Sequence, residues 1–254
     1  MLTERMDFQG PHGKLSAKLD APDGTPRAYG VFAHCFTCSK DVLAATRIAQ
    51  GLAERGVAML RFDFAGLGAS TGDFADTNFS SNVDDLVAAA DFLRARFAAP
   101  TLLVGHSLGG AAVLAAAHRI PESKAVVTIA APSDPRYVVD KLLSEHLDTI
   151  AQLGEARVRL AGRNFSIRQQ FVDDASGHRL HERIAQLERA LMVMHAPQDD
   201  TVDMANAGRI FELAKHPRSF VSLDGIDHLV TGRDDAAYVA AIIAAWSARY
   251  LDAA

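Results

Sequence analysis

A serine in this chain lies in a setting that suits nucleophilic chemistry. Ser107 belongs to the sequence GHSLGG, residues 105–110, which contains a G-x-S-x-G pentad. An apolar run at residues 101–104 precedes the pentad, and an alanine-rich helical stretch at residues 111–117 follows it. On such a strand-to-helix bend the hydroxyl is exposed, and the glycines remove Cβ atoms that would collide with the strand and the helix. We predict that Ser107 accepts an acyl group from a substrate.

A base must take the serine proton at neutral pH, and the chain has ten histidines. With this order of elements, the base is expected on the loop between the last sheet strand and the final helix. His228, in the sequence DGIDHLV, has that place after the apolar run at residues 220–223. We therefore predict His228 as the base, and we expect His106 and His195 to be structural.

The histidine in turn needs a carboxylate that orients its ring. The loop after the apolar run at residues 191–195 reads APQDDTVD and places Asp199 beside Asp200. Adjacent side chains point in different directions, so only one of the two can face the histidine. We predict Asp199, with Asp200 and Asp134 as alternatives, since Asp134 also follows a strand end.

Two backbone N–H groups are candidates for holding the oxyanion that forms when a carbonyl is attacked. The N–H of Leu108 lies at the start of the helix after Ser107, where N–H groups are free and the helix dipole is positive. The second N–H is expected from the loop after the strand at residues 29–33. That loop reads HCFT at residues 34–37, and Phe36 is the predicted donor.

The only two cysteines, Cys35 and Cys38, form a C-x-x-C pair in the same loop. A dithiol at a helix N-terminus can be redox-active, because the helix dipole lowers a thiol pKa. A lone C-x-x-C lacks the second pair of ligands that a zinc site requires. The pair is therefore a possible thiol site, and the alternative is two inert or mildly reactive thiols.

Apolar runs alternate with helical patterns along most of the chain. We predict strands at residues 15–19 (an edge strand), 29–33, 57–62, 102–104, 125–130, 191–195 and 220–223. Helices are predicted at residues 41–55, 83–97 and 235–251, the second with Ser81 or Asn82 as its N-cap. The alternation favours an α/β fold with a mostly parallel central sheet covered by helices on both faces. Sites in such sheets form at the carboxyl ends of the strands.

Residues 132–190 interrupt this rhythm and are predicted to form a lid. They contain a helical stretch at 135–153, an extended pair around Ala161-Gly162-Arg163 that indicates a β-hairpin, and a helical stretch near 180–189. Nine basic and nine acidic residues balance there, so nothing selects a charged substrate. The predicted organisation is a core of residues 1–131 and 191–254 with the lid inserted between them.

Length and composition set the class of protein. The chain has 254 residues, 49% of them hydrophobic and 22% charged, with a formal net charge of −5, which is typical of a soluble globular protein. Neither a nucleic-acid footprint nor a basic membrane-binding face is indicated. The uncharged stretch at residues 97–118 is broken by proline and glycines, and the N-terminus has no secretory signal pattern. We expect a cytoplasmic protein with small-molecule partners.

Together these motifs resemble the α/β-hydrolase superfamily over nearly the whole chain. The resemblance is carried, in order, by HCF, by DFAGLGASTG at residues 63–72, by GHSLGG, by PQDDTV and by DHL. More narrowly, AHCFTCSKD, RFDFAGLGAS and TNFSSNVDDL look like the esterase half of bacterial proteins in which such a hydrolase is fused to an OsmC-like domain. The resemblance implies a short-chain carboxylesterase and an OsmC-like domain or protein as a partner. No OsmC-like region follows residue 254, so the chain would be a stand-alone relative or a shortened one.

We therefore predict a serine carboxylesterase that hydrolyses short-chain acyl esters through Ser107, His228 and Asp199, with no metal or organic cofactor. A thioesterase or a peptidase would use the same groups, because only the pocket and the lid choose the leaving group. A ligand-binding or sensing protein on a hydrolase scaffold is a further alternative.

Overall fold

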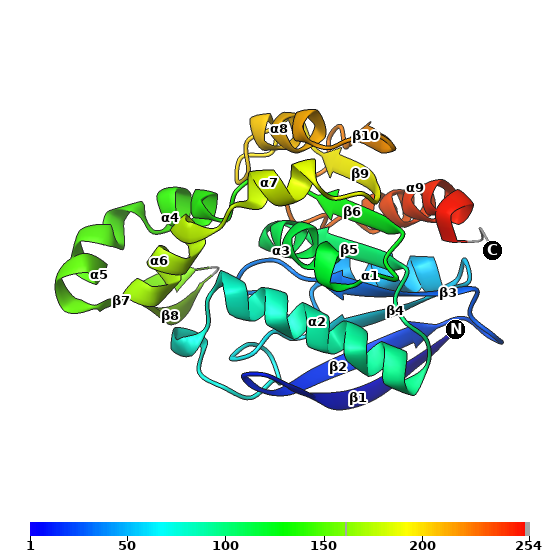
Figure 1. The fold of residues 1–254 in the computed structure, drawn as a ribbon, viewed down its shortest axis with the longest axis horizontal. Coiled ribbons are helices and arrows are strands. Elements are labelled where there is room, and N and C mark those ends of the chain that lie inside the picture. Colours follow the sequence, from blue (N-terminus) through cyan, green and yellow to red (C-terminus); the bar gives the residue numbers. More distant parts are fainter. Residues whose placement is uncertain (161, 252–254) are drawn as a thin grey trace.

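The computed structural model describes residues 1–160 and 162–251, and its centre is an eight-stranded sheet in the order β1-β2-β4-β3-β5-β6-β9-β10. β2 pairs antiparallel with both β1 and β4, whereas neighbouring strands from β4 to β10 run parallel (Figure 1). The strands are Leu2–Gly10 (β1), Gly13–Ala21 (β2), Ala28–Ala33 (β3), Val57–Phe62 (β4), Leu102–His106 (β5), Ala125–Ile129 (β6), Ala190–His195 (β9) and Arg218–Ser222 (β10).

Helices cover both faces of this sheet. α1 and α9 pack against each other on one face, and α2, α3, α7 and α8 lie on the other (Figure 1). The bounds are Leu43–Ala53 (α1), Phe79–Arg96 (α2), Leu108–Ala116 (α3), Leu180–Ala185 (α7), Ala205–Leu213 (α8) and Arg233–Leu251 (α9), with 3-10 turns at Phe74–Asp76 (η1) and Ala117–Arg119 (η2). The predicted fold class, a mostly parallel sheet flanked by helices, is confirmed.

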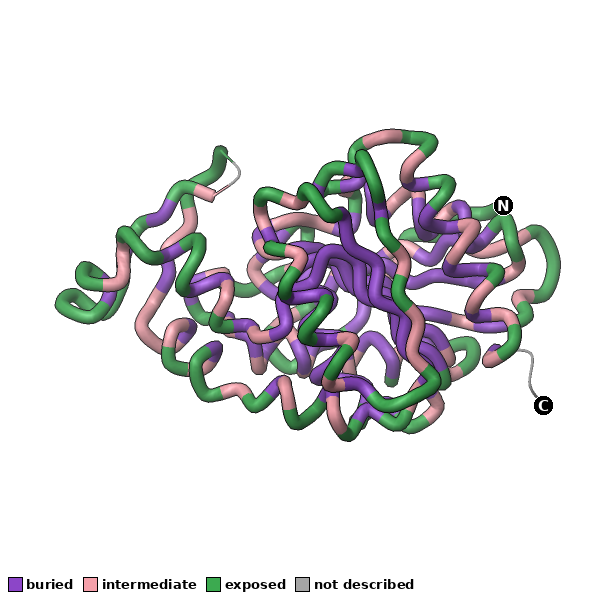
Figure 2. The backbone as a smooth tube through the Cα atoms, turned by 90° about the horizontal axis from the view of Figure 1, so that it is seen from above, coloured by how far each residue is buried: buried purple, intermediate pink, exposed green. Residues whose placement is uncertain are grey.

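The core lies in the middle of the sheet. Every residue of β4, β5, β6 and β9 is buried, and these strands form the purple centre of Figure 2. A parallel strand covered on both faces needs apolar side chains on both sides, so it reads as a continuous apolar run. That is why these strands are legible in the sequence.

The 132–190 segment adds a group of elements between β6 and β9. It contains α4 (Arg136–Leu142), η3 (Ser144–His146), α5 (Leu147–Leu153), the antiparallel hairpin of β7 (Glu155–Leu160) and β8 (Arg163–Arg168), and α6 (Gln169–Gly177) before α7. These elements project beyond one end of the sheet, whereas α7 packs on α3 and α8 (Figure 1). Ala161, in the predicted hairpin turn, lies outside the described residues.

The helical stretch predicted over residues 135–153 forms as two helices, α4 and α5. The chain turns through η3 between them, after the fully buried Leu143. The extended stretch after the hairpin turn ends at Arg168, where α6 begins. The hairpin itself is present as predicted.

The N-terminal half also differs from prediction at two places. Residues 15–19 belong to β2, which is not an edge strand, because β1 lies outside it and packs Phe8 against Phe62 and Phe92. The second helix starts earlier than predicted. Asn78 caps α2, since its side chain accepts from Ser81 N–H at 2.8 Å while Ser81 Oγ accepts from Asn78 N–H at 2.8 Å.

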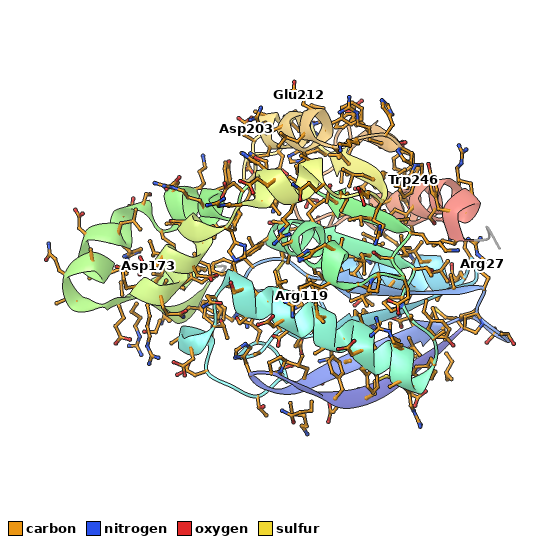
Figure 3. The ribbon with its side chains drawn as sticks, in the orientation of Figure 1. Arg27, Arg119, Asp173, Asp203, Glu212 and Trp246 are labelled. Atoms are coloured by element: carbon orange, nitrogen blue, oxygen red, sulfur yellow. A yellow bond between two sulfur atoms is a disulfide. The ribbon has the colours of Figure 1, made fainter. Side chains whose placement is uncertain are left out.

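Polar contacts join the outer helices to their neighbours. On α9, Trp246 donates through Nε1 to Oγ of Ser219 on β10 at 3.1 Å, and on η2, Arg119 donates to Asp84 of α2 at 2.6 Å (Figure 3). Across residues 1–160 and 162–251, no helix combines the length and the apolar character needed to cross a membrane.

Candidate active site

Ser107 lies on the sharp turn between β5 and α3. Its φ of 54° and ψ of −126° are rare for a residue with a Cβ atom, and such strained backbone concentrates at functional sites. Gly105 and Gly109, on either side of Ser107, have no room for a Cβ atom. A Cβ on Gly105 would lie 2.2 Å from the carbonyl oxygen of Gly109, and a Cβ on Gly109 would lie 2.4 Å from the carbonyl oxygen of Ala33. The turn therefore has the geometry of a nucleophile elbow.

His228 and Asp199 complete a chain of hydrogen bonds that starts at this serine. Nε2 of His228 lies 3.1 Å from Oγ of Ser107, and Nδ1 of His228 lies 2.7 Å from Oδ2 of Asp199. A carboxylate only accepts, so Nδ1 carries a proton and Nε2 is left to accept from the serine hydroxyl. The structure thus brings together the three side chains that the sequence predicts, from loops after β5, β9 and β10.

The loop after β9 decides which carboxylate faces the histidine. The side chain of Asp199 is fully buried, and its Oδ1 accepts from the N–H groups of Thr201 and Val202, both at 2.9 Å. Burial would raise the pKa of Asp199, but the hydrogen bond from His228 and those from the backbone outweigh it and hold the pKa below its usual value. Asp200 is exposed, and Asp134 accepts from Arg136 N–H at the start of α4 instead.

Two further histidines support this arrangement, as predicted. His106 donates through Nε2 to the carbonyl of His228 at 2.7 Å, and His195 donates to the carbonyl of Val202 at 2.7 Å. Burial is the main cause that lowers the pKa of both, to about 4 for His106, with the nearby His228 as the next cause there. Both rings are therefore neutral donors that hold the loops of the site.

Phe36 lies in a tight turn beside the elbow, residues 35–38. The N–H of Cys38 donates to the carbonyl of Cys35 at 3.1 Å, and a disulfide between these two cysteines closes the same turn. Thr37, the third residue of the turn, has a φ of 59°. Neither cysteine is a free thiol in this structure, and a redox role of the pair stays a prediction.

His34 fixes the direction of the peptide unit that carries the Phe36 N–H. Nδ1 of His34 donates to the carbonyl of Cys35 at 2.8 Å, and the carbonyl and N–H of one peptide unit point in opposite directions. Burial lowers the pKa of His34 to about 4, so its ring is neutral. In the described part of the chain, neither Phe36 N–H nor Leu108 N–H donates to backbone outside its own element. A role of these two N–H groups as oxyanion donors stays a prediction.

The comparisons with known proteins agree with this geometry. Residues 31–254 match the sequence model of the alpha/beta hydrolase family. The chain belongs to the alpha/beta hydrolase family. The esterase domain of a Rhodothermus marinus protein is 47% identical, with 99% of this chain and 100% of that chain covered and a TM-score of 0.82.

More distant structures share the fold of this hydrolase. Est1E from Butyrivibrio proteoclasticus, with ferulic acid bound, is 21% identical at a TM-score of 0.79, and the match covers 98% of this chain and 100% of that chain. XC6422 from Xanthomonas campestris, described as an a/b serine hydrolase without lid, is 20% identical at a TM-score of 0.69, with 99% and 96% covered. No curated protein is similar enough to count as a match. The OsmC-like partner stays a prediction.

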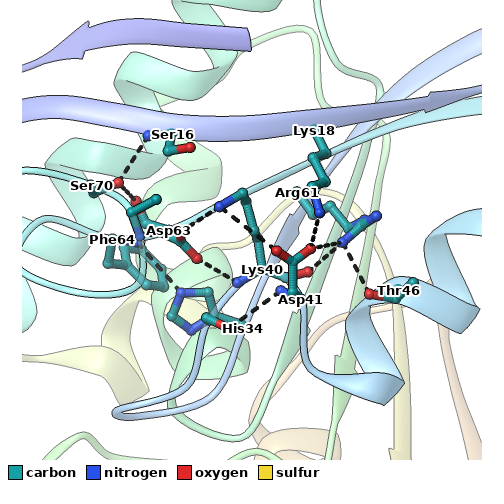
Figure 4. Close-up of polar contacts among 12 residues, drawn as sticks. Ser16, Lys18, His34, Lys40, Asp41, Thr46, Arg61, Asp63, Phe64 and Ser70 are labelled. Carbon is teal, nitrogen blue, oxygen red and sulfur yellow. Dashed lines mark hydrogen bonds and ion pairs between the residues drawn. The ribbon is translucent and has the colours of Figure 1, made fainter. Parts of the chain in front are cut away.

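A buried ionic network holds the C-terminal end of the 35–38 turn (Figure 4). Asp63, directly after β4, accepts from both the N–H and the Nζ of Lys40 at 2.6 Å and from Ala69 N–H at 2.8 Å. Arg61 donates to the carbonyl of Lys40 at 2.6 Å. The N–H and the carbonyl of Lys40 are therefore both hydrogen-bonded, and these bonds fix the chain where it leaves the 35–38 turn. A Cβ on Gly68 would lie 2.1 Å from Oδ2 of Asp63, which explains that glycine.

Two cavities border the turn. A nearly filled one, about 10 Å³, lies against Phe36 and Leu108 and is otherwise lined mainly by the apolar side chains Phe64, Leu67, Phe74 and Ala112. An open one, about 480 Å³, is lined by both cysteines, Val42, Leu43, Arg163 and Leu229 among others. A third cavity, about 630 Å³, lies away from Ser107 between α2 and the α6–α7 region, and opposite charges balance in its lining.

Among the described residues, no group of three or more His, Cys, Asp or Glu side chains is placed to hold a metal.

Three residues of this region had no role predicted from the sequence: His34, Lys40 and Arg163. Arg163 begins β8 and donates to the carbonyl of Thr37 in the 35–38 turn. The position of His34 directly before the predicted oxyanion loop is a signal that could have singled it out. Lys40 and Arg163 act through contacts with residues 23 and 126 positions away, and local sequence carries no sign of these.

Proposed function

We propose that this hydrolase is a serine carboxylesterase that cleaves short-chain acyl esters through an acyl-enzyme intermediate. The observation that carries the proposal is the hydrogen-bonded series from Ser107 through His228 to Asp199. Oγ of Ser107 attacks the ester carbonyl while Nε2 of His228 takes its proton, and the resulting imidazolium is stabilised by Asp199. His228 then gives the proton to the leaving alcohol, and water repeats the sequence to release the acid.

The tetrahedral intermediate carries negative charge on the former carbonyl oxygen. The N–H of Leu108, at the start of α3, and the N–H of Phe36 are the proposed donors to that oxygen. The closeness of α3 to the end of β3, which the glycine at position 109 permits, supports this pairing. Fixed backbone donors need no reorganisation when the charge develops, which is why they favour the transition state over the substrate.

The cavities support a short acyl group. A space of about 10 Å³ beside Phe36 and Leu108 is close to the minimum that holds one water-sized group. We therefore assign the acyl chain to this side and the alcohol to the open cavity of about 480 Å³. The 47% identical Rhodothermus marinus relative is an esterase domain, which agrees with ester substrates.

The test is steady-state hydrolysis of p-nitrophenyl esters from acetate to laurate by wild type and by Ser107→Ala. We expect the fastest turnover with acetate, a steep decline as the acyl chain lengthens, and a loss of about 10³-fold or more in kcat for Ser107→Ala. Equal turnover by Ser107→Ala would contradict the role of the serine. Stoichiometric acylation of Ser107 without turnover of any ester would contradict the esterase and favour a binding or sensing protein.

A further inference from the structure

We propose that Arg163 is a positioning residue for ester hydrolysis, because it holds the oxyanion turn at residues 35–38 from the side of the β7–β8 hairpin. The inference rests on the proposed esterase function. Arg163 does not contact Ser107, His228 or Asp199 in any described hydrogen bond. It acts through the peptide unit after Thr37, whose carbonyl accepts from its guanidinium.

Apart from the bond from Arg163, the hydrogen bonds that hold the turn lie at its two ends. The carbonyl of Cys35 accepts from His34 and from Cys38 N–H, and the exit at Lys40 is fixed by Asp63 and Arg61. Thr37 lies between these anchors with a left-handed φ of 59°, a conformation that non-glycine residues rarely adopt. A backbone held in such a state needs outside contacts to persist. Arg163 supplies one for the Thr37 carbonyl.

Aromatic packing around the β7–β8 hairpin also positions the Arg163 guanidinium. The Arg163 guanidinium lies over the ring of Phe165, 5.1 Å from its centroid. Phe165 packs on Phe74 of η1 at 4.7 Å, and Phe74 in turn packs on Phe36 at 5.7 Å. A second ring of the 132–190 segment, Phe171 on α6, lies 5.3 Å from Phe36. Phe36, the proposed oxyanion donor, thus contacts this segment directly through Phe171 and indirectly through Phe74 and Phe165.

A contact of this kind has a recognisable kinetic effect. The oxyanion donors interact more strongly with the charged intermediate than with the neutral ester, so loosening them lowers kcat and leaves substrate binding nearly unchanged. Removing a whole oxyanion donor costs about 10²–10³-fold in kcat. Loosening one through Arg163 should cost less, about tenfold.

The experiment compares Arg163→Met, Arg163→Lys and Arg159→Met with wild type. Arg159 is the matched control, since it is an exposed arginine on the partner strand of the same hairpin. Each variant is measured for kcat and KM with p-nitrophenyl acetate, and for inhibition by an aryl trifluoromethyl ketone, whose hemiketal with Ser107 places a charged oxygen among the oxyanion donors. The melting temperature of each variant is recorded alongside.

We expect Arg163→Met to lower kcat about tenfold with KM within about twofold, and to weaken the trifluoromethyl ketone by the same factor. Arg163→Lys, which can still donate to Thr37, should recover part of the loss, and Arg159→Met should match wild type. A rise in KM at constant kcat would overturn the inference in favour of substrate binding by Arg163, and unchanged kinetics would overturn it outright. Inactive wild type would contradict the proposed function itself.

Discussion

Asp199 and Asp200 are neighbours in the chain with opposite surroundings. Asp199 is buried and accepts from His228 and from two backbone N–H groups, whereas Asp200 is exposed and accepts only from the hydroxyl of Thr201 among the described contacts. An amide at position 199 could keep the backbone bonds, but its NH₂ group would face Nδ1 of His228. The ring would then favour the tautomer that cannot accept the serine proton.

We therefore expect Asp199→Asn to lower kcat for p-nitrophenyl acetate by about 10²–10⁴-fold, and Asp200→Asn to stay within about twofold of wild type. Stopped-flow and steady-state rates of the two variants at one pH provide the measurement. Similar losses in both variants, or a larger loss in Asp200→Asn, would contradict the assignment of Asp199 as the orienting carboxylate.

At this scale the sequence predicts residue types and order better than side-chain directions. Ser107 and His228 are legible because the pentad and the position after the last strand are local signals. The choice between Asp199 and Asp200 depends on a turn whose Asp199 N–H bonds to the carbonyl of Ala196, a detail of backbone geometry. His106 and His195 were expected to be structural, and both donate to carbonyls of the site loops.

At the scale of elements, the 35–38 turn combines two closures over the same four residues. The backbone bond from Cys38 to Cys35 and the disulfide between their side chains both shorten the path around Phe36. Cys38 is half-exposed and lines the open cavity, so a small reductant can reach the disulfide. Dithiothreitol would transfer two electrons to it, leaving two thiols and a cyclic oxidised reagent.

We expect reduction to lower kcat by about tenfold with little change in KM, because the Phe36 N–H becomes less well fixed. The variant with serine at both positions 35 and 38 should show the lower kcat without reductant and no further response to it. The measurement is kcat for p-nitrophenyl acetate against dithiothreitol concentration, with thiols counted in parallel. Full activity after the two thiols have appeared would contradict a role of the disulfide in catalysis.

Elements were predictable where one pattern dominates. The buried parallel strands read as apolar runs, but β1 does not, because most of its side chains are exposed and only Phe8 and Gly10 are buried. The predicted start of α2 was too late because Ser81 or Asn82 was expected as its N-cap, whereas the capping box of Asn78 and Ser81 sets the start. The division of α4 from α5 follows tertiary packing around Leu143, which local periodicity does not report.

At the scale of the whole molecule, the strand order of the sheet brings residues that are far apart in the sequence into one site. β5, β6, β9 and β10 are parallel neighbours, so the loops after β5, β9 and β10 emerge at one edge and bring Ser107, Asp199 and His228 together. The sequence predicts this convergence through the strand-helix alternation. The 132–190 segment meets the same edge through Arg163 and Phe171, and its role as a lid stays a prediction.

Asp85 links α2 to the loop after β4, and ionisation of its buried carboxyl group destabilises the folded state. Its side chain is buried, Oδ2 accepts from Ala65 N–H at 2.9 Å, and Oδ1 has no hydrogen-bond partner among the described residues. Burial raises the pKa of Asp85 to about 6 against the bond from Ala65, while the nearby Asp84 raises it slightly and His12 lowers it. The folded state thus holds this proton more tightly than the unfolded state, in which the pKa is near the ordinary 3.8.

Between about pH 4 and pH 6 the folded chain therefore binds more protons at Asp85 than the unfolded chain, and this group's contribution to stability falls as pH rises through that window. Asp85→Asn keeps an acceptor for Ala65 N–H and never ionises. The free energy of unfolding of Asp85→Asn minus that of wild type should therefore rise from pH 4 to pH 7, by up to about 3 kcal/mol. This rise does not depend on the size of the difference at pH 4. Urea unfolding at both pH values measures the difference. Parallel pH profiles for wild type and Asp85→Asn would mean that Asp85 ionises equally in the folded and unfolded states.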